Sequence, residues 1–298
     1  MTLRAAAKPG MVPHPTVARA EALLADALPR RQRPLRGRML SRFRRNHGRW
    51  PDPGRLRSSL ADYLYFRRLG PDLSDPLIRE TTDKAHAKDY VARLVGDIAV
   101  PTLALLSLPE EVSDAVFPAD CAIKPTHASG EYILRAGDAP LDLDRIRRWF
   151  DLDYHALSGE HQYRGLRPQV IVEPLVFGNA APTDYKILCR EGRARLIDVF
   201  TDRKTGLRRT VFDRDWRRHP IRCNFPASER EIARPPALDR MIAIAEALAA
   251  PFELVRIDLY SEGDAVLVGE ITHCPHGGAL RFGSAEEEAR YDALIFGP

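Results

Sequence analysis

The sequence has 298 residues, of which 44% are hydrophobic, and its mean hydropathy is −0.32. This length and balance are typical of a globular protein with two or three compact lobes. No run approaches the roughly 18 apolar residues that cross a bilayer, and residues 1–9 lack the apolar core of a secretion signal, so we expect a cytoplasmic protein without an integral membrane segment. Four cysteines lie far apart and form no Cys-x-x-Cys pair, which argues against a zinc ribbon and a disulfide framework.

The net charge of +4 conceals an asymmetry along the chain. Residues 1–60 hold 14 basic residues against three acidic ones, a net charge of +11, so the remainder carries −7. Such a basic block can bind an anionic partner, dock on the acidic remainder of the chain, or form a solvated helix face. Its densest part is poor in aromatic residues, with Phe43 and Trp50 alone, which disfavours a nucleic-acid partner.

The first part of the chain has the pattern of helices. Apolar residues recur at helical spacing in three segments, which are 16–28, 37–46 and 55–68. A turn-rich connector at 70–76 separates them from a further helix over 84–96, which ends before a short strand. The N-terminal part of the chain is therefore predicted to be a basic helical region.

From residue 120 onward, strands dominate the pattern. A hairpin is expected over 121–135, and a helix over 142–151 follows it. The remaining expected elements are strands at 169–172, 185–190 and 195–201, a helix at 236–249 and a closing hairpin that holds Asp258 and Glu270. Antiparallel hairpins mixed with helices indicate an α+β fold rather than a doubly wound parallel sheet.

The closing hairpin carries the most informative pair of residues, Asp258 and Glu270. Each lies inside an otherwise apolar strand, and the eleven residues between them allow a tight turn at 261–264. A carboxylate inside a buried strand is costly unless it is paired. Two carboxylates on facing strands repel each other unless a cation lies between them, and oxygen ligands suit Mg²⁺. The alternative is a pair of solvent-facing acids on an edge hairpin.

Lysines upstream of this hairpin could bind an anion. Lys124 ends a strand and precedes a loop that closes with Ser129 and Gly130, so an ammonium group and backbone N–H groups could approach one phosphate. Lys84 is a second candidate of this kind. The loop does not match the Walker A pattern, and the chain has neither a Gly-x-Ser-x-Gly elbow nor a Gly-x-Gly-x-x-Gly motif, which argues against serine hydrolases and dinucleotide binding.

Two further cations lie within strands. Lys186 begins an otherwise apolar strand, so we expect it to have an anionic partner, which is a bound anion or one of Asp184 and Asp198. Arg256 lies two residues before Asp258, so strand alternation places both on one face. The arginine there could support a transferring phosphoryl group or form a structural ion pair with Asp258.

A nucleotide base could dock on the strand at 171–176. This strand is apolar up to Glu173 and stops at Pro174, next to Leu175, and adenine often binds against such a stretch. The alternative is an edge strand that the proline ends. His127, in the loop of the first hairpin, could contact a phosphate or an acceptor, or be a solvated loop residue.

The chain resembles an ATP-grasp protein and, more narrowly, the teichuronopeptide-biosynthesis (TupA-like) ATP-grasp family. The similar elements span residues 60–298 and follow one another in the same order. These elements are Lys84, Lys124 with Ser129-Gly130, Glu173-Pro174-Leu175, Asp184-Tyr185-Lys186, Arg256-x-Asp258, Glu270-x-Thr272, Pro275 and Gly277-Gly278.

The resemblance implies an ATP-grasp fold, in which two α+β lobes sandwich ATP, preceded here by the basic helical region. The implied parts of the chain are 1–60 for that region, 61–118 for the part before the ATP-grasp lobes, 119–175 for the small lobe and 176–298 for the large lobe with the Mg/ATP site.

The resemblance also implies roles for residues. By position, Lys84 and Lys124 would hold the α- and β-phosphates of ATP. Arg256 would support the γ-phosphoryl group, and Lys186 would face the nucleotide or the acceptor. The implied cofactor-binding residues are Lys84, Lys124, Ser129, Gly130, Glu173, Pro174, Leu175, Asp184 and Lys186.

Asp258, Glu270 and Thr272 are the implied ligands of Mg²⁺. The wider superfamily usually has Glu-x-Asn on the second metal strand, whereas this chain has threonine in place of the asparagine. Threonine offers one weaker oxygen, so a second Mg²⁺ would be held less tightly or through water.

The activity that the resemblance implies is that of a bacterial ATP-dependent ligase, which joins a carboxylate to an amine through an acyl phosphate. The acceptor would be a cell-envelope glycan precursor or an amino-acid polymer, with Arg203, Arg281 and His127 as candidate substrate-binding residues. The basic N-terminal region would suit an anionic acceptor. Two alternatives remain open, namely a kinase that uses the same ATP site and a binding module without turnover.

Overall fold

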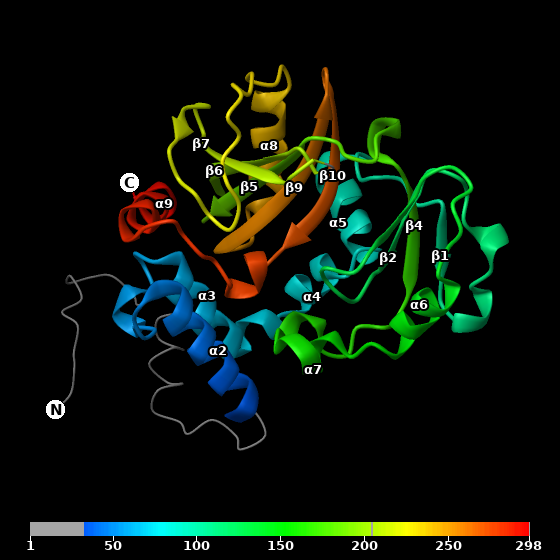
Figure 1. Cartoon of the computed structure of the whole chain (residues 1–298), viewed down its shortest axis with the longest axis horizontal. Coiled ribbons are helices and arrows are strands. Elements are labelled where there is room, and N and C mark those ends of the chain that lie inside the picture. The colour runs from blue at the N-terminus through cyan, green and yellow to red at the C-terminus, as the bar shows by residue number, and fades with distance from the viewer. Residues whose placement is uncertain (1–32, 204, 298) are drawn as a thin grey trace.

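In the computed structural model the chain forms two lobes, each built on an antiparallel sheet (Figure 1). The structure describes residues 33–203 and 205–297, so the helix expected over 16–28 lies outside the described residues. Among the helices of the described part, none combines the length and the hydrophobicity that a membrane crossing needs.

The helices of the described residues are α2 (Arg33–His47), α3 (Leu60–Leu69), α4 (Pro76–Thr82), α5 (His86–Val95), α6 (Leu143–Arg148), α7 (Tyr154–Ser158), α8 (Leu238–Ala249) and α9 (Ala285–Phe296). The strands are β1 (Ala104–Leu106), β2 (Cys121–Pro125), β3 (Ile133–Arg135), β4 (Val170–Pro174), β5 (Asp184–Arg190), β6 (Arg193–Thr201), β7 (Arg208–Asp213), β8 (Arg218–His219), β9 (Leu254–Glu262) and β10 (Ala265–Thr272). The α+β class expected from the sequence is confirmed.

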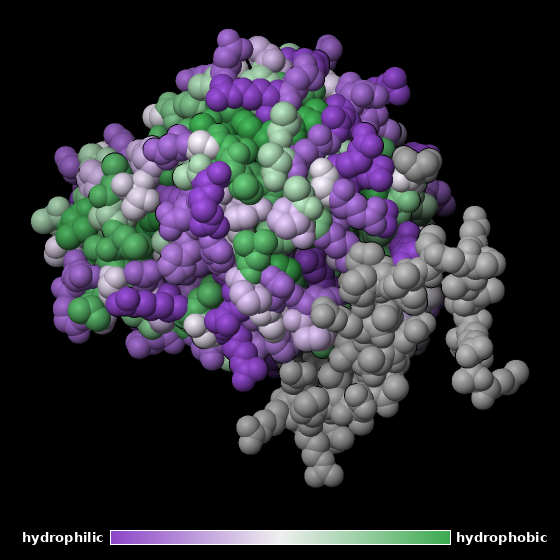
Figure 2. Space-filling view, turned by 180° about the vertical axis from the view of Figure 1, so that it is seen from behind, coloured by the Kyte–Doolittle hydropathy of each residue, from purple (hydrophilic) through white to green (hydrophobic). Residues whose placement is uncertain are grey.

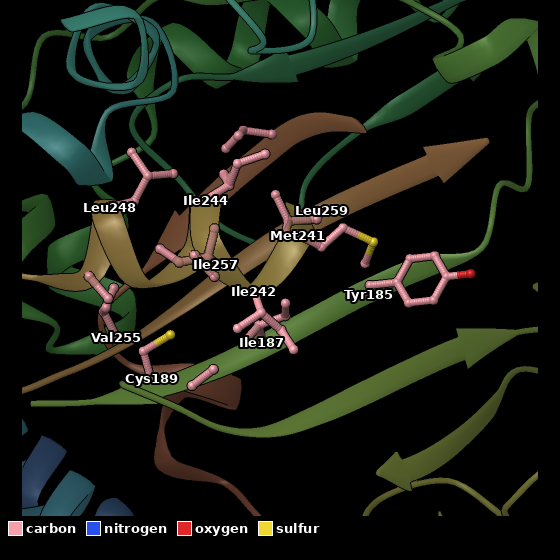
Figure 3. Close-up of a cluster of buried hydrophobic side chains, with 14 of the residues drawn as sticks. Tyr185, Ile187, Cys189, Met241, Ile242, Ile244, Leu248, Val255, Ile257 and Leu259 are labelled. Atoms are coloured by element: carbon pink, nitrogen blue, oxygen red, sulfur yellow. The ribbon is translucent and has the colours of Figure 1, made fainter. Parts of the chain in front are cut away.

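The large lobe is a six-stranded sheet in the order β10-β9-β5-β6-β7-β8. Alternate residues of β5 and β9 point to one face, where Ile187 and Ile257 are directly opposite each other. This apolar face packs on α8, as the side chains in Figure 3 show. Each fully buried isoleucine there contributes about 1.5–3 kcal/mol through the hydrophobic effect.

The opposite face of the large sheet is divided between core and site. Near one end, Leu188 and Leu196 pack with α3 and α9. At the other end the same alternation presents Asp258 and Lys186, which are paired across β9 and β5. One sheet face therefore changes from an apolar core to a polar surface along the strands.

The small lobe is a four-stranded sheet in the order β1-β4-β2-β3. One face packs on α6 and the turn after it, where Ile123 and Val172 share a buried cluster with Ile146 and Trp149. The strand β1 lies at its edge, and three large apolar side chains near it stay exposed, so Figure 2 shows hydrophobic side chains on the surface of this lobe. Since β1 begins at residue 104, the sheet starts before residue 119, where the sequence placed the start of the small lobe.

The basic helix α2 docks on α3 rather than extending from the molecule. Met39 and Phe43 of α2 are buried against Tyr65 and Phe66 of α3. Figure 1 shows α2 and α3 below the large sheet, beside α7. The helices expected over 37–46, 55–68 and 84–96 correspond to α2, α3 and α5, whereas α4, α7, α9, β7 and β8 were not anticipated.

Candidate functional site

A cavity of about 480 Å³ lies between the two sheets. All nine residues that the sequence suggested for cofactor binding line it, as do Asp258 and Glu270. Apolar side chains of the small lobe complete its wall, among them Ala122 of β2, Leu134 of β3 and Val176 just after β4. The cavity thus has an apolar part on the small lobe and a charged part on the large lobe.

Glu173 organises the charges of the small-lobe wall. Its two oxygens lie 2.6 Å from Lys88 Nζ and 2.6 Å from Lys124 Nζ. Burial acts to raise the pKa of Glu173, but the two ammonium groups outweigh burial and lower it. Glu173 therefore holds the ammonium group of Lys124, which lines the cavity. Sequence reasoning missed Lys88, because its ion pair joins α5 to β4, which lie far apart in the sequence.

Lys84 enters the cavity from the segment between α4 and α5. Its ammonium donates to the carbonyl of Ala128, in the loop that ends with Ser129 and Gly130. Burial lowers its pKa, while the nearby carboxylate of Glu270 acts in the opposite direction. The side chain thus links the loop after β2 to the charged end of β10.

Asp258 is the most heavily paired carboxylate of the site. Its oxygens accept from Arg256 Nε at 2.6 Å and Arg256 Nη2 at 2.8 Å, and also from Lys186 Nζ. Burial acts to raise the pKa of Asp258, but Arg256 and then Lys186 outweigh it and lower it. Lys186 also lies 2.9 Å from Asp184, so both ion pairs that the sequence offered as alternatives, Arg256–Asp258 and Lys186–Asp184, are present.

Glu270 lies directly opposite Asp258 in the β9–β10 register, as the predicted hairpin required. The register shifts between Val268 and Glu270, which makes a β-bulge at Gly269. A Cβ on Gly269 would lie 2.7 Å from the ring of Tyr260, so the bulge needs glycine. Among the described residues, no hydrogen bond or ion pair engages the Glu270 carboxylate.

The donor set here fits a magnesium ion that is held together with a nucleotide. Asp258 and Glu270 are hard oxygen donors on facing strands, and the described residues contain no cluster of three or more acidic, histidine or cysteine side chains that could hold a metal. Mg²⁺ commonly binds through one or two carboxylates, with water and phosphate oxygens as its other ligands. Thr272 fits less well, because it offers a single hydroxyl, which accepts from Arg256 at 3.1 Å, and it lines a neighbouring cavity. Asp258 also accepts from Arg256 and Lys186, so Glu270 is the carboxylate of the pair that no described cation engages.

That neighbouring cavity has a volume of about 1190 Å³. It meets the first at Ser129, Gly130, Lys186, Arg203 and Leu207, which line both. Its wall is rich in cations from the large sheet and from α2 and α3. These cations are Arg38, Arg42, Arg45, Arg68, Lys186, Arg203 and Arg256.

The structure does not bring all candidate substrate residues into these cavities. Arg203 lines both and donates to Asp184. His127 is buried elsewhere, with Nε2 3.0 Å from the carbonyl of Trp149, and burial lowers its pKa. Arg281 is exposed, pairs through its backbone with Asn224, and lines neither cavity.

The model of the TupA-like ATP-grasp family matches residues 70–295, which is most of the chain. The chain belongs to this family. The ATP-grasp fold expected from the resemblance is therefore confirmed for this chain. No protein of curated function matches its sequence.

Three solved structures are similar to this chain over about two thirds or more of its length. D-cycloserine synthetase DcsG is 16% identical with a TM-score of 0.40, covering 78% of this chain and 77% of that one. The ligase PsnB complexed with a minimal precursor is 13% identical with a TM-score of 0.39, covering 76% of this chain. The Bacillus anthracis D-alanine–D-alanine ligase complexed with ATP is 14% identical with a TM-score of 0.38, covering 66% of this chain. The chain spans 61% of the length of PsnB and 56% of that of the D-alanine–D-alanine ligase.

Proposed function

We propose that the protein is an ATP-dependent ligase that joins a carboxylate to an amine through an acyl phosphate. The observation that carries the proposal is the junction of two cavities. One joins an apolar wall to lysines and two facing carboxylates, and the other is lined by cations. MgATP would occupy the first and an anionic acceptor the second, so that the acceptor carboxylate meets the γ-phosphate where the cavities join.

ATP would lie with its base against the small lobe and its phosphates toward the large lobe. Ala122, Leu134 and Leu175 offer apolar contacts for adenine, while Lys84 and Lys124 offer cations for the phosphates. Bound Mg²⁺ would neutralise the phosphate charge that grows during transfer. The residues that would hold it are Asp258 and Glu270.

The acceptor would be anionic, in keeping with a cell-envelope glycan precursor or an amino-acid-type acceptor. Arg256 and Arg203 are already paired with Asp258 and Asp184. The arginines of α2 differ, because among the described residues none of Arg38, Arg42 and Arg45 has an ion-pair partner. These spaced cations would bind acidic groups of the acceptor.

The test is product analysis with purified protein, MgATP and three acidic compounds with one, two and four carboxylates, namely glucuronic acid, L-glutamate and tri-L-glutamate. A ligase releases ADP and free phosphate and forms an amide when an amine is added. Phosphate that stays on a hydroxyl of the acceptor would identify a kinase instead. ATP-dependent thermal stabilisation without any ADP formation would identify a binding module and overturn the proposal.

A further inference from the structure

Glu160 is the one carboxylate among the described residues that line the cationic cavity. It lies between α7 and the 3₁₀ turn His161–Tyr163, and 5% of the residue is exposed. One oxygen, Oε2, accepts a hydrogen bond of 2.7 Å from Gln162 Nε2. No described residue donates to the other oxygen, Oε1. A buried acid thus faces the space that we assign to the acceptor.

Glu160 has no ion-pair partner among the described residues, although Arg68 is near it. The guanidinium of Arg68 instead donates to the carbonyls of Gly277 and Ser158. The paired carboxylates Glu173 and Asp258 differ, because each receives two cations. A buried carboxylate without a cation is costly, so its retention here points to a cation that arrives with a ligand.

The cavity of about 1190 Å³ that Glu160 lines leaves room for a cationic group beside its carboxylate. Gly277 has φ of +56°, and a Cβ at this position would lie 3.2 Å from Oε1, so its backbone approaches the carboxylate closely. Burial raises the pKa of Glu160 to about 7, opposed by Arg68 and Gln162 and reinforced by the charge of Glu270. Besides the seven cations of this cavity named above, the titratable groups that face Glu160 or share its cavity are Tyr154, Tyr163, Cys274 and His276.

We propose that Glu160 binds the ammonium group of the amine co-substrate and removes the proton that must leave before the nitrogen attacks. The inference rests on the proposed ligase function and extends it. The cationic cavity would then make two kinds of contact. Its arginines would bind the acidic groups of the acceptor, and its one carboxylate would bind a primary amine. Glu160 is then a catalytic residue of the second half-reaction and not of acyl-phosphate formation.

The proposed step balances without any further reactant. The ammonium group loses one proton to the Glu160 carboxylate, and the nitrogen lone pair attacks the carbonyl carbon of the acyl phosphate. The new C–N bond forms as the C–O bond to phosphorus-bound oxygen breaks, and the departing phosphate keeps the electron pair. The second proton of the nitrogen is transferred to that phosphate. General-base help of this kind typically contributes about 10²–10⁴-fold in rate.

Hydroxylamine separates the two half-reactions, because near neutral pH it is largely unprotonated and needs no base. The experiment supplies MgATP and the three carboxylates named above, with either hydroxylamine or L-alanine as the nucleophile. We expect Glu160→Gln to form hydroxamate at about the wild-type rate and amide at least about 100-fold more slowly. Wild-type amide formation should fall as the pH drops below about 7, whereas hydroxamate formation should not follow this profile.

Asp292→Asn is the matched control. Asp292 is also a buried carboxylate whose pKa burial raises to about 7, but it accepts from the backbone of Leu60 and lines neither cavity. This variant should keep both products.

If Glu160→Gln forms amide normally, or loses hydroxamate as well, the role of Glu160 is overturned while the ligase function stands. If wild-type protein forms no hydroxamate with any of the carboxylates, the ligase function itself fails.

Discussion

Asp258 and Glu270 face each other across one strand pair, yet their electrostatic states differ. Asp258 is paired with both Arg256 and Lys186, and all three side chains are largely buried. Glu270 has no such partner among the described residues and is half-buried. Asp258 therefore contributes to the folded state as well as to a metal site, while Glu270 is available to a ligand.

Amide substitutions should separate these two roles. Glu270→Gln should abolish Mg²⁺-dependent ADP formation without lowering stability, since it removes a carboxylate that holds no ion pair. Asp258→Asn should abolish the same activity and also lower the free energy of unfolding by about 3–5 kcal/mol, because it leaves buried cations uncompensated. ADP release and urea unfolding measure the two effects.

A third substitution controls for the mere loss of a carboxylate. Glu110→Gln, at an exposed position of the small lobe, should change neither quantity. If Glu270→Gln retains Mg²⁺-dependent ADP formation, Glu270 is not a ligand of the metal. Unfolding of Asp258→Asn at the wild-type urea concentration would show that its ion pairs add nothing to stability.

For single residues, the sequence predicts how side chains are placed relative to one another within one strand or one hairpin. Strand alternation and hairpin length placed Asp258 opposite Glu270 and on the same face as Arg256, and the structure confirms both. Lys88 and Glu160 were missed, because each acts through neighbours that are distant in sequence. His127 shows the same limit, since packing against Trp149 buries a residue for which a contact with phosphate or acceptor was suggested.

The helix α2 places arginines of the basic N-terminal region at the wall of the cationic cavity. Its apolar residues Met39 and Phe43 dock on α3, and Arg38, Arg42 and Arg45 follow at spacings of four and three, which places them on one face. This face lines the cationic cavity. The arginine run of the sequence is thus, in part, the wall of a cavity and not a detached tail.

Replacing the three cavity arginines by glutamine should weaken the binding of an anionic acceptor. Contacts of roughly 0.5–1 kcal/mol each predict a KM for the acceptor that rises about 10- to 100-fold, while the affinity for ATP stays unchanged. Steady-state kinetics with tri-L-glutamate and ATP titrations measure the two quantities. Added salt should weaken acceptor binding in wild-type protein more than in the variant.

Arg44 offers a control on the same helix. Its guanidinium lies 4.5 Å from the ring centre of Trp50 and lines neither cavity, so Arg44→Gln should leave the acceptor KM unchanged. An equal rise in KM in both variants would mean that net charge, and not the face toward the cavity, decides binding.

Elements with continuous apolar periodicity were predictable, whereas a strand that opens with two adjacent arginines was not. The strand β7 escaped notice because Arg208 and Arg209 interrupt its apolar pattern. Arg209 is nevertheless fully buried, and it is paired with Asp198 at 2.6 Å and with the hydroxyl of Tyr291 at 2.8 Å. Its partners come from β6 and α9, so the local sequence gives no sign that a charge can be buried there.

Across the whole molecule, buried carboxylates should make stability depend on pH in two opposite ways. Nearby cations lower the pKa of Glu173 and Asp258, so their stabilisation is present above the ordinary carboxyl pKa and is lost as the pH falls through the folded value. Burial raises the pKa of Glu160 and Asp292 to about 7. The folded protein therefore binds these two protons more tightly than the unfolded chain, and this stabilisation is lost as the pH rises toward 7.

Glu160→Gln and Asp292→Asn should each remove one contribution to the loss of stability that occurs as the pH rises toward 7. Relative to either variant, the wild-type free energy of unfolding should fall between about pH 4.5 and pH 7, by up to roughly 1.4 kcal/mol per pH unit for each group. Urea unfolding at a series of pH values measures the difference, with Glu110→Gln as the flat reference. If the difference between wild type and Glu160→Gln does not change with pH, the carboxylate titrates normally, and a base that accepts a proton near neutral pH must be sought elsewhere in the cavity.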